Sequence, residues 1–269
     1  MTYTEHSISF HNNLLYYYKA GNGPEPLLLF HGFAQDHTFF ESIIKSVSND
    51  YTLYLFDLFF HGKSAWPNIE TPLKKENWKQ ILELFLQENS IEMFSVGGFS
   101  LGGKLVLCTL ESFADRINRL FLLAPDGIKI SPWYKLATSS LPMRKFFRSM
   151  ISHPQIFNLM VTLATHVRPG DKSIVRFAES QMNTKEKRSR VYNTWVVFRK
   201  LKFNMKVIGS LMDTLPHPPL IIVGKFDKVI KASFMTSLSN HSKKVKIIPL
   251  ETGHNGILKH PDLPEWMTL

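Results

Sequence analysis

Three residues that could act together in nucleophilic catalysis lie far apart in this chain. Ser100 stands between glycines in "SVGGFSLGGK" (95–104), Asp227 lies in "VGKFDKV" (223–229), and His254 lies in "LETGHNG" (250–256). Each of them comes at or just after the end of an apolar run. A serine hydroxyl is a poor nucleophile until a base accepts its proton, and that base needs an acid to orient it. A serine, a histidine and a carboxylate brought together would be able to attack a carbonyl carbon.

The glycines around Ser100 allow two interpretations. They could mark an ordinary tight turn, or they could permit a strained strand-to-helix turn that presents the hydroxyl. The residues before Ser100 are strand-like and those after it are helix-like, and larger side chains at Gly98 and Gly102 would clash in such a turn. The start of a helix would also offer backbone N–H groups and a partial positive charge to an oxyanion. This context favours Ser100 as a nucleophile.

Strands and helices alternate along most of the chain. Apolar runs predict buried strands at 26–33, 51–57, 117–127, 219–227 and 244–254, with two short strands at 7–19. Helical spacing covers 36–47, with Asp36 as the N-cap, and 76–89. This order predicts an α/β fold with a mostly parallel sheet flanked by helices. Ser100, Asp227 and His254 would then lie at the carboxyl ends of strands, where such sheets bind ligands.

The tract 131–208 interrupts this alternation with successive helical patterns. We therefore expect a core of 1–127 and 209–269 that is interrupted by an all-helical insertion of 128–208. Residues 126–219 hold 16 Lys/Arg and 5 Asp/Glu, a net charge of +11, whereas the whole chain carries +10. Such an asymmetry indicates either a solvated basic layer or attraction to acidic ligands or anionic surfaces.

The composition narrows the class of protein. Of the 269 residues, 44% are hydrophobic and 20% are charged, which is typical of a soluble globular protein. No apolar run approaches the ~18 residues of a membrane span, so no integral membrane segment is expected. The polar N-terminus lacks a secretory pattern, and the single cysteine, Cys108, favours a reducing compartment, which predicts a cytoplasmic protein. No histidine or cysteine spacing indicates a metal, and the basic run 185–190 indicates a solvated helix face rather than a nucleic-acid site.

The motifs together resemble the α/β-hydrolase superfamily over about residues 8–260. The resemblance rests on the elbow "GGFSLGG", on "LLLFHGF" (27–33) and "YLFDLFFHGKS" (54–64), and on the order Ser100, Asp227, His254. It implies Ser100 as the nucleophile, His254 as the general base and acid, and Asp227 as the orienting carboxylate. It further implies an oxyanion hole from the backbone N–H groups of Leu101 and Phe33, a structural His31, and no cofactor. It also implies that the helical tract 128–208 is the cap that the family inserts after its sixth core strand.

Two features leave parts of this assignment open. Asp126, at the end of "LLAPD", is a rival acid because some relatives carry their carboxylate after that strand; we favour Asp227. Asp57, His61 and Gly62 match a family turn written D-x-P-G-H-G-x-S, but Phe59 and Phe60 replace the proline and glycine. The aromatic pair would then either protrude near the site or stiffen the turn.

The resemblance implies a serine hydrolase that cleaves a carboxylic ester or thioester through an acyl-enzyme intermediate. Its partner would be a small-molecule substrate, acidic or with an apolar acyl group. Two alternatives stay open: a C–C bond hydrolase or pathway lyase of the same fold, and a binding protein that retains the fold without catalysis. For a lyase, Lys104 stands where an arginine is expected. Haloalkane and epoxide chemistry is not favoured, because those relatives carry aspartate at the position of Ser100.

Overall fold

The computed structural model describes residues 3–167 and 179–268. The chain divides into two compact units. The core unit comprises the chain up to Pro67, Lys74–Lys129, and Leu201 onward. The helical unit comprises Asn68–Leu73 and Ile130–Lys200.

The described part of the core unit is built on an eight-stranded sheet with the order β1-β2-β4-β3-β5-β6-β7-β8. The pairs β1–β2 and β2–β4 are antiparallel, and the other neighbours are parallel. The predicted α/β fold with a mostly parallel sheet is therefore confirmed. The strands are β1 (Thr4–Phe10), β2 (Asn13–Ala20), β3 (Glu25–Phe30), β4 (Tyr51–Phe56), β5 (Phe94–Phe99), β6 (Ile117–Leu123), β7 (Leu220–Gly224) and β8 (Lys246–Leu250).

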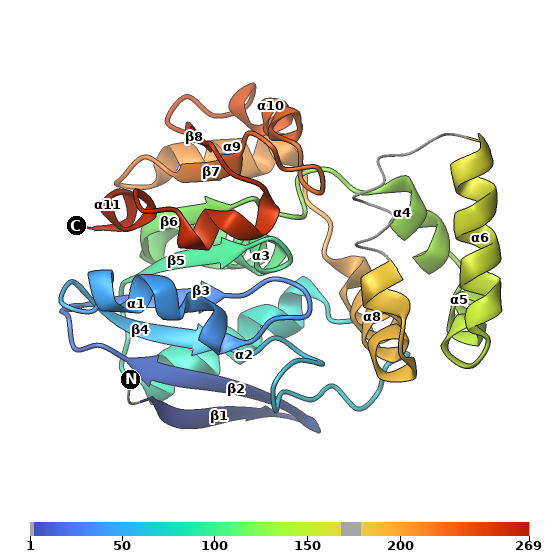
Figure 1. Ribbon diagram of the computed structural model, residues 1–269. Helices are drawn as coiled ribbons and strands as arrows, with labels where there is room; N and C mark the ends of the chain where they lie inside the picture. The colour runs from blue at the N-terminus through green and yellow to red at the C-terminus, as the bar shows by residue number, and fades with distance from the viewer. Residues whose placement is uncertain (1–2, 168–178, 269) are drawn as a thin grey trace. The chain divides into compact units, whose positions relative to one another are not determined.

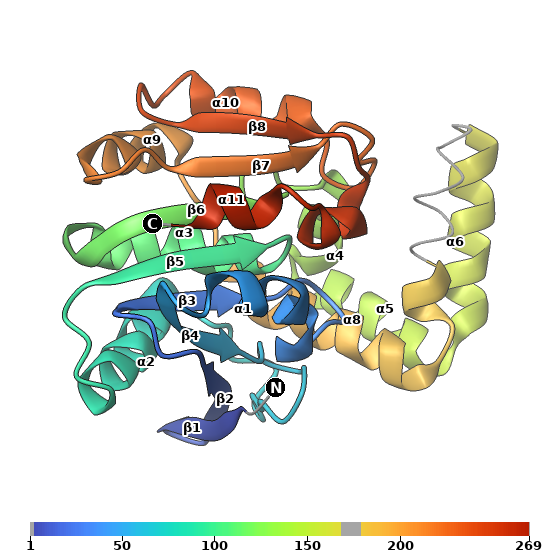
Figure 2. The same ribbon diagram turned by 60° about the vertical axis from the view of Figure 1, so that its left-hand side comes forward.

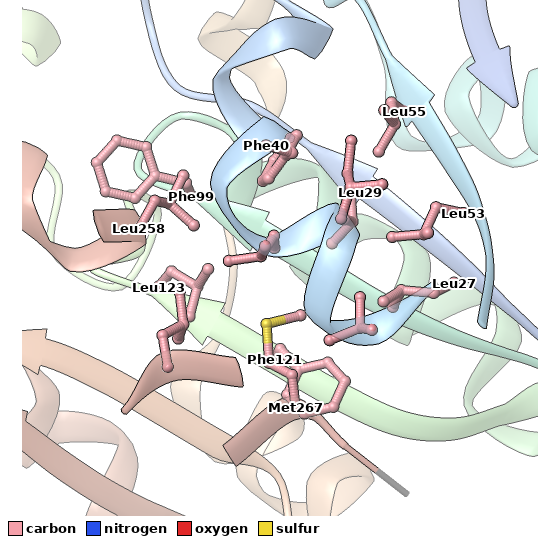
Figure 3. Packing of buried hydrophobic residues seen from close by; sticks show 14 of the residues in the cluster. Leu27, Leu29, Phe40, Leu53, Leu55, Phe99, Phe121, Leu123, Leu258 and Met267 are labelled. Atoms are coloured by element: carbon pink, nitrogen blue, oxygen red, sulfur yellow. The ribbon is translucent and has the colours of Figure 1, made fainter. Parts of the chain in front are cut away.

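Helices cover both faces of this sheet (Figure 1), so its central strands are apolar on both sides. Figure 2 shows α1 (Glu41–Val47) and α11 (Leu263–Met267) on one face, with α2 (Lys75–Glu88) and α3 (Gly102–Phe113) on the other. On the α1 face, alternate strand residues such as Leu27 and Leu29 join Phe121, Leu258 and Met267 in one buried cluster (Figure 3). Since side chains alternate across a strand, Leu28 and Phe30 point to the opposite face.

The helix α2, predicted at 76–89, occupies the opposite face and turns an apolar stripe toward the sheet. Trp78, Ile81, Leu82 and Phe85 are all buried. The Trp78 ring lies edge-on to Phe30 at 5.3 Å, and its indole N–H donates to Thr109 Oγ1 on α3 (3.0 Å). This bond pairs a buried polar group of α2 with α3, the helix that follows Ser100.

Residues 36–47, predicted as one helix, form two. Asp36 accepts a hydrogen bond from the backbone N–H of Thr38 (3.0 Å) and caps a short 3₁₀ helix, η1 (His37–Phe40), before α1 begins. The predicted N-cap is thus present, but it caps a tighter helix. The remaining elements of the core unit are η2 (Ala114–Arg116), α9 (Met205–Thr214), η4 (Ala232–Met235), α10 (Thr236–Ser239) and η5 (His254–Lys259).

The described residues of the helical unit form helices without strands. They are α4 (Pro132–Thr138), α5 (Leu141–Ser152), α6 (Pro154–Val167), α8 (Lys185–Val197) and η3 (Phe198–Lys200). Phe147 of α5 packs against Tyr192 of α8, with ring centroids 5.3 Å apart. Residues 168–178 of the predicted helical tract lie outside the described residues.

The boundaries of the two units differ by a few residues from the expected division of the chain. Asn68–Leu73 belongs to the helical unit because Leu73 N–H donates to Val197 O (2.9 Å) and Arg199 donates to Glu70 O (3.0 Å). The helix α9, which begins before residue 209, belongs to the core unit. A Cβ atom on its Gly209 would lie 2.2 Å from the carbonyl oxygen of His241, so α9 packs closely on the loop before β8. None of the described helices is long and apolar enough to cross a membrane.

Candidate active site

The candidate site is centred on Ser100, in the turn between β5 and α3. Ser100 has a φ of +50°, a left-handed conformation that is costly for a residue with a side chain. Its N–H continues the parallel ladder by donating to Leu123 O of β6 (2.9 Å). Its carbonyl accepts from Gly103 N (2.9 Å) and from Asp126 N (2.8 Å). The surrounding backbone thus holds the strained residue on three sides.

Two glycines allow the backbone to pass this closely. A Cβ on Gly98 would lie 2.7 Å from the carbonyl carbon and oxygen of Gly102. A Cβ on Gly102 would lie 2.0 Å from Phe30 O, at the end of β3. Real Cβ atoms do not approach backbone atoms to such distances, so any other residue would force β5, α3 or β3 apart. The glycines that the sequence places two residues on either side of Ser100 are required by packing.

Ser100, His254 and Asp227 lie together in one hydrogen-bonded chain. The Ser100 Oγ–His254 Nε2 distance is 3.0 Å, and the His254 Nδ1–Asp227 Oδ2 distance is 2.6 Å. A carboxylate only accepts hydrogen bonds, so Nδ1 carries the proton and Nε2 is left to accept from the serine hydroxyl. This is the geometry of a nucleophile, a base and an orienting acid.

Backbone hydrogen bonds hold the carboxylate of Asp227 in place beside His254. Asp227 follows β7, its side chain is fully buried, and its Oδ1 accepts from the backbone N–H groups of Val229 and Ile230 (2.8 Å each). His254 begins η5 after β8, and its ring packs against Phe99 at a centroid distance of 4.9 Å. These three neighbours, Val229, Ile230 and Phe99, were not predicted from the sequence. A turn following an aspartate, in "DKVI", is the one signal that could have indicated the two backbone donors.

The loop after β3 lies directly against the elbow. A Cβ on Gly32 would lie 2.8 Å from the Phe99 ring, and Gly102 packs on the carbonyls of Phe30 and His31. Within the described residues, the backbone N–H groups of Phe33 and Leu101 donate to no protein acceptor. Two backbone donors therefore stand unused on either side of this contact.

His31 and His61 hold this loop rather than facing Ser100. The Nδ1–H of His31 donates to Gly32 O (2.7 Å), and its Nε2 accepts from Leu58 N (3.0 Å). His61 accepts from Ala34 N at Nε2 (2.9 Å) and donates to Phe59 O from Nδ1 (3.0 Å). Complete burial, with the nearby His61 adding to it, lowers the pKa of His31 well below its ordinary value. A ring that stays neutral and has both nitrogens bonded to the backbone is a structural histidine.

The turn 57–64 closes despite the replacement of its proline and glycine. Ser64 Oγ donates to Asp57 O (2.6 Å), and Gly62 approaches so closely that a Cβ would lie 1.7 Å from Asp57 Oδ2. Phe60 takes a left-handed conformation with φ +70°. Phe59 is buried with its ring edge-on to Trp66 at 4.9 Å. Phe59 therefore stiffens the turn, which is the second of the two alternatives stated for the aromatic pair.

The rival acid Asp126 does not reach the histidine. Its Oδ2 pairs with Lys104 Nζ at 2.8 Å, and its Oδ1 accepts from Gly127 N (2.7 Å). Lys104, whose side chain is only 5% exposed, lies on the first turn of α3 with its ammonium against this carboxylate. Cys108 is buried in the same helix, and its burial raises the pKa of the thiol, as expected for a core residue.

Comparison with known proteins identifies the class of the chain. The family of the alpha/beta hydrolase fold matches residues 25–261, and the chain belongs to it. A pimeloyl-[acyl-carrier protein] methyl ester esterase of Nitrosomonas europaea is 22% identical over 262 residues, covering 90% of this chain and 93% of the relative.

Solved structures agree on the fold. An esterase from Thermogutta terrifontis superposes with a TM-score of 0.70 at 18% identity, over 99% of this chain and 98% of that one. The naproxen esterase of Bacillus subtilis superposes with a TM-score of 0.65 at 17% identity, over 98% of this chain and 90% of that one. A hydrolase fold together with relatives that are esterases is consistent with ester hydrolysis by a serine hydrolase mechanism.

Proposed function

We propose that this protein cleaves a carboxylic ester or thioester through an acyl-enzyme, with Ser100 as nucleophile, His254 as base and acid, and Asp227 as orienting carboxylate. The observation that carries the proposal is the continuous chain from Ser100 Oγ to His254 Nε2 (3.0 Å) and from Nδ1 to Asp227 (2.6 Å). It is supported by membership of the alpha/beta hydrolase family and by the esterase relative that spans nearly the whole chain.

In the acylation step, Ser100 Oγ attacks the substrate carbonyl carbon while His254 Nε2 takes the hydroxyl proton. The carbonyl oxygen becomes an oxyanion and accepts from the N–H groups of Leu101 and Phe33. Removal of one such donor in other enzymes costs roughly 3–4 kcal/mol of transition-state stabilisation. The imidazolium, stabilised by Asp227, then gives its proton to the leaving alcohol or thiol.

In the deacylation step, water takes the place of the leaving group. His254 accepts a proton from this water, which attacks the acyl carbonyl, and the same two N–H groups hold the second oxyanion. His254 returns the proton to Ser100 Oγ as the acid product departs. The cycle needs no group other than the side chains and backbone of this chain, and water.

A panel of chromogenic substrates tests the reaction class. We expect p-nitrophenyl esters of varied acyl length to be hydrolysed with a burst of p-nitrophenol, and a fluorophosphonate probe to label the protein at Ser100. The burst follows from the acyl-enzyme, which accumulates when deacylation is the slower step. Labelling without turnover of any ester or thioester, but with turnover of a vinylogous 1,5-diketone, would assign C–C bond hydrolysis instead. Absence of labelling would indicate a binding protein.

The charge distribution supports a substrate that carries negative charge. Residues 126–219 hold the net charge of +11, whereas the rest of the chain is nearly neutral. Fixed positive charge raises the encounter rate of anionic ligands, and salt screens this attraction over about 8–10 Å at physiological ionic strength. We propose that an ester bearing a carboxylate or phosphate is preferred over a neutral one.

The salt dependence of kcat/KM tests this preference. A neutral p-nitrophenyl ester and its ω-carboxylated analogue are compared from ~10 mM to ~1 M salt, over which the screening length falls from about 30 Å to 3 Å. We expect the carboxylated ester to be favoured at low salt and to lose that advantage as salt rises. Equal salt dependence for the two esters would mean that the basic residues serve only solubility.

We further propose that the helical unit acts as a cap of the catalytic core. Its support is the position of Ile130–Lys200 in the chain, between β6 and β7, where the family inserts a cap. We also place the protein in the cytoplasm, on the ground that its single cysteine is a free, buried thiol.

A further inference from the structure

Lys104 is a charged residue in the interior of the core unit. It is 4% exposed, and its ammonium lies 2.8 Å from Asp126 Oδ2. Its stem packs against the loop after β6, because a Cβ on Gly127 would lie 3.1 Å from Lys104 Cγ. Burying an ammonium costs free energy that an ion pair offsets only in part, and replacement of such pairs by apolar residues is often neutral or stabilising. The position of this pair points to a role beyond stability.

Asp126 links the ion pair to the nucleophile through the backbone. Its side chain is held at both oxygens, by Lys104 Nζ and by Gly127 N (2.7 Å). Its own N–H donates to the carbonyl oxygen of Ser100 (2.8 Å), which also accepts from Gly103 N (2.9 Å). The carbonyl of Ser100 is therefore held by α3 on one side and by the ion-paired loop on the other.

This carbonyl belongs to the same peptide group as the N–H of Leu101. A trans peptide is planar, so the direction of the Ser100 C=O fixes the opposite direction of the Leu101 N–H. Hydrogen bonds accepted by the carbonyl also polarise the N–H, strengthening it as a donor by about 10–30% per bond. Catalytic donors must be held to within about 0.5 Å and 10–20° of the productive geometry.

We propose that Lys104 and Asp126 are positioning residues that aim the Leu101 N–H at the oxyanion by clamping the Ser100–Leu101 peptide. The inference rests on the proposed function, since it assigns how one of the two oxyanion donors is held. The low exposure of the Lys104 side chain, 5%, does not favour a role in binding substrate.

The test removes both charges at once. In the variant Lys104→Met/Asp126→Asn neither charge is left buried alone, and the Asp126 N–H remains. We expect kcat for a p-nitrophenyl ester to fall about tenfold with KM unchanged, a fraction of the ~10²–10³ lost when an oxyanion donor is removed altogether. The inhibition constant of a trifluoromethyl ketone, which forms a tetrahedral adduct on Ser100, should rise by the same factor.

A matched variant controls for loss of an ion pair as such. Lys75 on α2 pairs with Glu111 near the other end of α3, and neither residue bonds to the elbow among the described contacts. Lys75→Met/Glu111→Gln should leave kcat and the ketone inhibition constant unchanged. If the double variant at 104 and 126 does not fold, the single variant Lys104→Met is used instead. It keeps the carboxylate of Asp126, which is partly exposed, and should show the same fall in kcat with KM unchanged.

The outcomes separate the two proposals. An active wild type whose Lys104→Met/Asp126→Asn variant keeps wild-type kcat and ketone affinity overturns the positioning role and leaves the proposed function standing. Equal losses in both double variants also overturn it, because the effect would then be general destabilisation of α3. A wild type that hydrolyses no ester or thioester overturns the proposed function and the positioning role with it.

Discussion

Replacing Ser100 by alanine is expected to abolish ester hydrolysis while the protein stays folded. The change removes the Oγ atom that lies 3.0 Å from His254 Nε2, and no other hydroxyl is hydrogen-bonded to this ring among the described residues. Loss of the nucleophile in a triad lowers turnover by ~10⁴–10⁶. The backbone bonds of residue 100 to Leu123, Gly103 and Asp126 do not involve the side chain, so the elbow should persist. The rate of p-nitrophenyl ester hydrolysis measures the loss of activity, and the thermal midpoint of unfolding shows whether the variant stays folded.

Ser210→Ala supplies the control for this variant. Ser210 lies on the exposed side of α9, where its hydroxyl donates only within the helix, to Lys206 O (3.0 Å). We expect that variant to match the wild type in rate and in thermal midpoint. A Ser100→Ala protein that hydrolyses esters as fast as the wild type would show that the nucleophile has been assigned to the wrong residue.

Features set by local sequence were predictable around Ser100. The continuous apolar runs of β3 and β4 indicate strands buried on both faces, and such strands occur almost only in parallel sheets covered by helices. The glycines at 98 and 102 indicate close backbone approach. The approach of Gly98 to Gly102 is local, but that of Gly102 to Phe30 O depends on β3 and β5 being neighbours in the sheet, which one sequence does not state.

Features set by contacts between distant segments were not predictable in the same way. The sequence favours Asp227 but leaves Asp126 as a rival acid, because each follows an apolar strand. The side-chain directions distinguish them: Asp227 Oδ2 lies 2.6 Å from His254, while Asp126 pairs with Lys104. Lys104 stands where an arginine is expected for a lyase, and its burial is a property of the packed loop after β6.

The conformation of the turn 57–64 was not predictable from the sequence either. Phe59 and Phe60 replace residues with special backbone properties, and the sequence leaves open where two large rings would go. The fold places Phe59 in the core against Trp66 and holds Phe60 at φ +70°. Phe60 N–H donates to Ser64 O (3.2 Å), and Ser64 Oγ donates to Asp57 O (2.6 Å). Tertiary packing therefore overrides a local preference for glycine at this position.

Replacing Asp227 by asparagine is expected to lower turnover by about 10⁴, through the tautomer of His254. The Oδ1 position accepts from the N–H groups of Val229 and Ile230, so the amide oxygen of an asparagine will occupy it. The amide NH₂ group must then point at His254 Nδ1, in place of the carboxylate oxygen at 2.6 Å. An NH₂ group donates, so Nδ1 must accept and the ring proton moves to Nε2. A protonated Nε2 cannot take the proton of Ser100.

Asp126→Asn is the matched comparison, because it makes the same chemical change after the neighbouring strand. That carboxylate bonds to Lys104 and Gly127 rather than to a histidine, so the ring tautomer is unaffected. We expect its kcat to fall no more than about tenfold, the positioning effect argued above for the oxyanion donor. Steady-state kcat of both variants on one p-nitrophenyl ester gives the ranking, and thermal midpoints show whether each is folded. If Asp126→Asn proved the more damaging of two folded variants, the orienting carboxylate would have to be Asp126, and His254 would need to turn away from Asp227 during catalysis.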